Sequence, residues 1–100
     1  MYDSVGHFNE GLAAVKKDSK QFHIHSNGNP AYEQRYDSVG PFHEGLAWVK
    51  RDGKHFHIRL NGTPAYEQRY DVVGSFHEGR AWAEKDGKHF HIRPDGTRAD

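Results

Sequence analysis

The chain has 100 residues, and its 14 lysines and arginines balance its 14 aspartates and glutamates, so the formal net charge is zero. A neutral chain is poorly suited to a nucleic-acid groove or an anionic membrane as its main partner, since both need a basic excess. The chain has no cysteine, which excludes disulfides, thiol catalysis and cysteine-ligated zinc. No apolar run approaches the roughly 20 residues that span a bilayer, and the N-terminal residues lack a signal-peptide pattern. The compartment is left open.

The sequence repeats itself with a period of 34 residues. The three units span 2–35, 36–69 and 70–100. Units one and two are identical at 25 of 34 positions, and units two and three at 21 of the 31 positions that they share. Similarity at a fixed period predicts a tandem array, here a single repeat domain over 1–100.

In chain order, each unit predicts a strand, a tight turn and a returning strand. In unit two the segment 45–52, GLAWVKRD, alternates and carries Trp and Val, which favours a strand. Asp52–Gly53 is a strong hairpin turn signal, and 54–60, KHFHIRL, is the returning strand. Asn61–Gly62 predicts a second turn. A third, more polar extended segment, PAYEQRYDSV, spans 30–39, where its proline suits a strand start or an edge.

No segment shows an apolar stripe with helical periodicity, so the predicted fold class is all-β. Successive side chains of a strand point to opposite faces. Phe56 and Ile58 therefore share one face of the returning strand, which we predict to be the core. The other face is predicted to carry His55, His57 and Arg59 as a polar surface.

The phrase YDSVGPFHEGLAWVKRDGK, followed by alternating Phe and Ile and by Asn-Gly, resembles the bacterial WG repeat family, also written KWG. The Phe-x-Glu-Gly-x-Ala motif of that family fits at 8–13, 42–47 and 76–81. The Trp-Gly pair that names the family is replaced by Gln21–Phe22, His55–Phe56 and His89–Phe90, which marks a variant branch. The resemblance implies tandem β repeats with binding or scaffold roles and no established reaction.

Nine histidines are a clear excess for this length. Two imidazoles at positions i and i+2 of a strand point the same way and can chelate Zn²⁺, Ni²⁺ or Cu²⁺. The candidate metal ligands are His23, His25, His55, His57, His89 and His91. The alternative is that these imidazoles are polar cover over the sheet. We favour that alternative, and expect no cofactor, because the pairs change register between the first unit and the others.

Enzyme signatures are absent: the sequence has no nucleophile elbow, phosphate loop or His-Glu-x-x-His helix. We therefore expect a non-enzymatic module that binds or scaffolds, since repeat arrays present the same side chains many times. The histidine-rich metal-binding protein is the alternative. The ligand is a protein, a peptide or a carbohydrate that the sequence does not identify. The candidate binding surface consists of Trp48, Trp82, Arg59, Arg93, His55 and His89.

Three short units can be arranged in more than one way. Our prediction is an open array of three β-hairpin repeats, with ring completion by oligomerisation and self-association through the repeat ends as options. The alternative is a single-chain, threefold, β-trefoil-like closure, in which the last residues meet the first and remove the exposed sheet edges.

Overall fold

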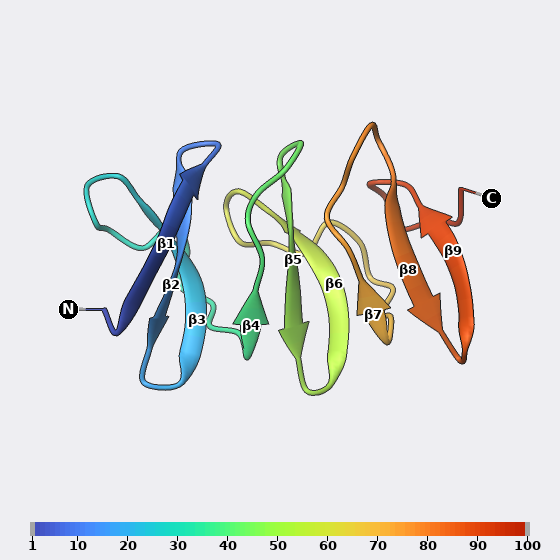
Figure 1. Ribbon diagram of the computed structural model, residues 1–100, viewed down its shortest axis with the longest axis horizontal. Coiled ribbons are helices and arrows are strands. Elements are labelled where there is room, and N and C mark those ends of the chain that lie inside the picture. Colours follow the sequence, from blue (N-terminus) through green and yellow to red (C-terminus); the bar gives the residue numbers. More distant parts are fainter. Residues whose placement is uncertain (1, 100) are drawn as a thin grey trace.

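The computed structural model describes residues 2–99, which form an all-β array of three sheets (Figure 1). Each sheet is antiparallel and has three strands in sequence order. The strands are β1 (Ser4–Asn9), β2 (Leu12–Lys17), β3 (Lys20–His25), β4 (Ser38–Val39), β5 (Leu46–Arg51), β6 (Lys54–Arg59), β7 (Val72–Val73), β8 (Ala81–Lys85) and β9 (Lys88–Ile92). No helix in the described part of the chain is long and apolar enough to cross a membrane.

Tight turns with positive φ at both central residues set the register of the sheets. Asp52 and Gly53 have φ angles of 53° and 79°, as a type I′ turn requires, and they join β5 to β6 in a hairpin. Glu44 and Gly45 have φ angles of 53° and 79° as well, so the Glu-Gly of the recurring motif is a second turn of the same kind. The hairpin prediction at Asp-Gly is thus confirmed.

The third extended segment of each repeat is mostly irregular. Only its last two residues form a strand, β4, and Tyr36 joins Gln21 of β3 through an isolated bridge. The backbone amide of Gln21 donates to the Tyr36 carbonyl over 2.8 Å, and the backbone amide of Tyr36 donates to the Gln21 carbonyl over 2.9 Å. His55 and Tyr70 make the same bridge one repeat later. These bridges connect each sheet to the next.

The array is open. Its extents are 42 × 26 × 19 Å, and β1 and β9 lie at opposite ends of the long axis (Figure 1). The predicted open array is confirmed, and the β-trefoil-like closure is wrong. Each sheet is linked only to its neighbours in sequence, so repetition extends the array and brings no pair of ends together.

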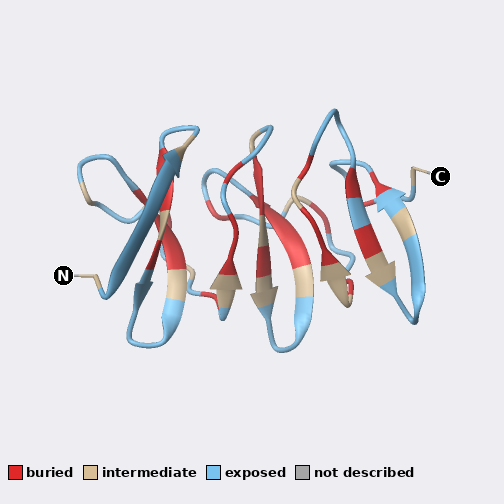
Figure 2. Cartoon of the chain, in the orientation of Figure 1, coloured by how far each residue is buried: buried red, intermediate tan, exposed pale blue. Residues whose placement is uncertain are grey.

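The core runs along the axis of the array and includes both faces of the returning strands β3 and β6 (Figure 2). In β9 the face that carries His89 and His91 is exposed. Phe22, Phe56 and Ile58 are buried as predicted. Arg35 and Arg69 place their guanidinium groups over the Phe22 and Phe56 rings, 3.7 and 3.9 Å from the ring centres. The guanidinium groups thus cover this face with cation–π contacts.

The prediction of a polar histidine face is wrong for two residues, because His23 and His57 are completely buried. The loop that follows each returning strand folds back over that face, and the next repeat packs against it. The Phe42 and Phe76 rings lie 4.5 Å from the His23 and His57 rings, measured between ring centres. The strand β6 is therefore covered on both sides.

Candidate functional site

Each buried histidine joins two neighbouring repeats by hydrogen bonds. His57 Nδ1 lies 2.6 Å from the Tyr66 hydroxyl, and its Nε2 lies 2.8 Å from the Gly74 carbonyl oxygen. His23 makes the same contacts with Tyr32 and Gly40, over 2.6 and 2.7 Å. The glycine belongs to the following repeat, so the imidazole connects one unit to the next.

The partners define the protonation of these rings. A carbonyl oxygen can only accept, so Nε2 carries the proton, and Nδ1 accepts from the tyrosine hydroxyl. Burial lowers the pKa of His23 and of His57 to about 4, and hydrogen bonding to the glycine carbonyl opposes that shift only in part. Burial also raises the pKa of the Tyr32 and Tyr66 hydroxyls. The rings are therefore neutral at pH 7, with both nitrogens engaged.

The remaining candidate metal ligands do not converge. His55 donates from Nδ1 to the Asp71 carbonyl over 2.9 Å, and burial lowers its pKa. His89 Nε2 lies 3.1 Å from Glu84 Oε1, while His25 and His91 are exposed. Residues 2–99 contain no group of three or more His, Asp or Glu side chains placed to hold a metal ion. His23 and His57 would have to give up a hydrogen bond to bind one.

The two tryptophans each lie against a glycine of their own repeat. A Cβ atom added to Gly40 would fall 2.0 Å from Trp48 Nε1, and one added to Gly74 would fall 2.0 Å from Trp82 Nε1. Trp48 is half-buried, and its ring lies 5.8 Å from that of His55. Trp82 stays 46% exposed. Of the predicted binding surface, Trp82 and His89 are thus the aromatic side chains most open to a ligand.

The two arginines of the predicted binding surface fasten loops. Arg59 donates to the Pro64 carbonyl over 2.8 Å, and Arg93 donates to the Arg98 carbonyl over 2.7 Å. Each also reaches the threonine hydroxyl of its own loop, at Thr63 and Thr97. Their guanidinium groups remain exposed, so each arginine can contribute charge to a surface while it holds the loop.

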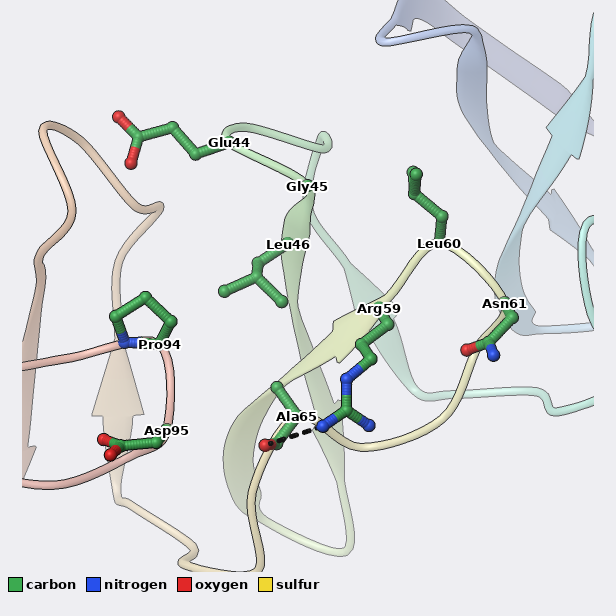
Figure 3. A pocket seen from close by; sticks show the side chains of 9 residues that line it. All are labelled: Glu44, Gly45, Leu46, Arg59, Leu60, Asn61, Ala65, Pro94 and Asp95. Carbon is green, nitrogen blue, oxygen red and sulfur yellow. Dashed lines mark hydrogen bonds between the residues drawn. The ribbon is translucent and has the colours of Figure 1, made fainter.

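A groove of about 670 Å³ lies between units two and three (Figure 3). The apolar walls of the groove are formed by Leu46, Leu60, Ala65 and Pro94. Its charged side chains are Glu44, Arg59 and Asp95, which Figure 3 labels. Leu60 is 45% exposed, so it offers apolar surface to a ligand in the groove. The groove brings together Arg59, which the sequence indicated, and Leu60, which it did not.

A ladder of glutamates crosses the repeats beside this groove. The Glu10 carboxylate accepts from the Glu44 and Gly45 amides over 2.7 and 2.8 Å. The Glu44 carboxylate does the same for the turn at Glu78 and Gly79. Glu10 and Glu44 are therefore each part of one turn and the cap of the next turn. The fixed 34-residue spacing of Glu-Gly in the sequence was the available signal for this role.

The fold and these junctions define a class of protein, the tandem β-repeat proteins, in which each unit completes the core of its neighbour. The family model described as WG containing repeat matches residues 1–20, 24–54 and 58–88. The chain therefore belongs to the WG repeat family, as its motifs suggested. No curated protein and no solved structure matches the chain.

Proposed function

We propose that the chain is a non-enzymatic binding module that holds a protein segment in the groove between units two and three. The observation that carries this proposal is Leu60, a large apolar side chain that stands 45% exposed beside a groove with further apolar walls. Apolar pockets with a few polar groups are the usual form of a ligand site. An extended segment with an apolar side chain fits such a groove.

The charges of the groove indicate what flanks that side chain. Glu44 and Asp95 carry two carboxylates and Arg59 one guanidinium group, so the groove is net negative. The segment therefore has a basic residue beside its apolar anchor, and an acidic one is disfavoured. The specificity of the site comes from this pairing.

The engagement of the other polar groups supports binding rather than catalysis. The Glu44 carboxylate accepts two turn amides, and His57 has both ring nitrogens hydrogen-bonded. A general base needs a free lone pair within reach of its substrate. These side chains instead spend their hydrogen-bonding capacity on the junctions between repeats.

Selection from a displayed library of unstructured peptides tests the proposal. Peptides enriched on the wild-type chain should carry an apolar residue next to a basic one, and Leu60→Glu should abolish their binding. The matched control is Ser26→Glu, at the equivalent position of unit one, which should leave binding intact. Enriched peptides that bind Leu60→Glu as well as the wild type, or a selection without enrichment, would overturn the groove as the site.

A further inference from the structure

The two ends of the array expose apolar side chains that the interior repeats bury. Val5 and Phe8 at the N-terminal end are 54% and 48% exposed, whereas their equivalents Val39 and Phe42 are 7% and 0% exposed. Trp82, at the other end, is 46% exposed, whereas its equivalent Trp48 is half-buried. Figure 2 shows β1 as an exposed strand, in contrast to the buried interior.

Each interior junction uses one set of contacts, and the set recurs 34 residues later. Besides the backbone bridge and the glutamate cap, Lys20 Nζ lies 2.8 Å from Asp37 Oδ1, and Lys54 Nζ lies 2.6 Å from Asp71 Oδ1. The stacking of a phenylalanine on the preceding histidine completes the set. One side of the junction supplies lysine, glutamate and histidine; the other supplies aspartate, turn amides and phenylalanine.

Unit three carries the lysine, glutamate and histidine of this set. Lys88, Glu78 and His91 occupy the positions of Lys54, Glu44 and His57, shifted by one repeat. The N–H and C=O groups of His89 point away from β8, because the ladder between the two strands alternates from the Lys85–Lys88 pair. In unit two, His55 uses these groups to bond Tyr70.

Unit one carries the aspartate, turn amides and phenylalanine of the set. Asp3 stands where Asp37 and Asp71 stand, and Phe8 where Phe42 and Phe76 stand. The turn at Glu10 and Gly11 has φ angles of 51° and 83°, close to those of the turns that receive a glutamate cap. The face of unit three thus has its complement on the other end of the same molecule.

We propose that unit three of one copy docks onto unit one of a second copy, at the step that relates successive repeats within the chain. Lys88 then pairs with Asp3, the Glu78 carboxylate caps the turn at Glu10, and Phe8 covers His91. A hollow of about 440 Å³ at this end, lined by residues that include Glu78, Trp82 and His91, is where unit one enters. This proposal does not depend on the peptide groove.

The contact between copies should be weaker than the one between units two and three. In unit three, Arg80 occupies the position that the buried Leu46 occupies in unit two, so the junction between copies lacks this apolar side chain. The contact is also head-to-tail, and a repeated head-to-tail step without closure produces an open chain of copies. The average mass therefore rises continuously with concentration and does not stop at a dimer.

Sedimentation velocity of the full chain, from micromolar to millimolar concentration, tests the proposal together with a charge exchange. Lys88→Asp and Asp3→Lys each place like charges at the junction and should weaken self-association by about tenfold or more. In an equimolar mixture each variant meets only the opposite charge on the other, so association should return. Glu67→Lys, which makes the same change of charge as Asp3→Lys but on a central loop, is the control and should associate like the wild type.

The outcomes separate clearly. A wild-type chain that stays monomeric at millimolar concentration would overturn the proposal, as would a discrete dimer without further growth. Variants that associate as strongly alone as the wild type would also overturn it. Association that is weak in each variant and returns only in their mixture supports docking through Lys88 and Asp3. Phe8→Ser should then abolish association in the otherwise wild-type chain, while circular dichroism shows the fold unchanged.

Discussion

The Tyr66 hydroxyl donates a hydrogen bond to Nδ1 of His57 over 2.6 Å, across a separation of nine residues. The same ring donates from Nε2 to Gly74 of the next repeat. The histidine at this position is therefore a structural connector, buried among aromatic rings. Its protonation and its hydrogen bonds should affect the stability of the array.

Replacing His57 by alanine should lower the free energy of unfolding by about 3 kcal/mol, because it opens a cavity and leaves the Tyr66 hydroxyl and the Gly74 carbonyl without partners. His91→Ala changes the equivalent residue of unit three, which is exposed and is not enclosed by a following repeat, and should lower stability by less than about half as much. Urea unfolding at low protein concentration measures both. Equal effects of the two substitutions would contradict the connector role.

Stability should fall as the pH drops from 6.5 towards 4. Burial lowers the pKa of His23 and His57 to about 4 in the folded chain, whereas the ordinary value is 6.5. In that window the unfolded chain binds protons that the folded chain does not, so protonation favours unfolding. Above pH 6.5 the neutral histidines cost the folded chain no stability. By pH 4 each of the two histidines lowers the free energy of unfolding by up to about 3 kcal/mol. Urea midpoints measured across this range test the window.

Substitution separates the two histidines from the carboxylates in that experiment. His57→Gln removes one of the two histidines with the largest pKa shift and should clearly reduce the pH dependence, whatever its effect on stability at pH 7. The reduction should stay below half, because His55 also has a lowered pKa. A midpoint that does not change between pH 7 and pH 4.5 in the wild type would refute the prediction.

The repeat period, the hairpins and the aromatic core could be predicted from the sequence because they depend on local signals. Asp52–Gly53 defines a turn within four residues, and the alternation around Phe56 and Ile58 defines a face. Alternation also places His57 on the opposite face. It does not tell whether a loop and the next repeat cover that face, since this depends on contacts distant in sequence.

The candidate site was predictable only in part, for the same reason. Arg59 lies in the groove as a charged residue of the returning strand, but Leu60 becomes notable only when the neighbouring repeat provides the opposite wall. Tyr66 recurs nine residues after His57, as Tyr32 does after His23. That recurrence was the one sequence signal for the buried hydrogen bonds.

Gly40 should not tolerate a side chain, although its backbone conformation is ordinary. A Cβ atom there would lie 2.0 Å from Trp48 Nε1, so Gly40→Ala displaces the indole and should lower stability by about 2 kcal/mol. At the equivalent Gly6 the nearest atom is the Ala14 carbonyl oxygen at 3.4 Å, and Gly6→Ala should cost much less. Thermal unfolding of the two variants compares them directly; similar melting temperatures would disprove the steric explanation.

The glutamate ladder predicts a difference between two exposed glutamates that look alike in sequence. Glu44→Ala removes the acceptor of the Glu78 and Gly79 amides and should destabilise the junction between units two and three by about 1 kcal/mol. Glu78→Ala should leave the stability of the dilute monomer unchanged, because no later turn within residues 2–99 is available for its carboxylate to cap. Hydrogen exchange of the Gly79 amide reports on the cap itself: it should accelerate in Glu44→Ala and stay slow in Glu78→Ala. Fast exchange of that amide in the wild type would mean that the cap does not form in solution.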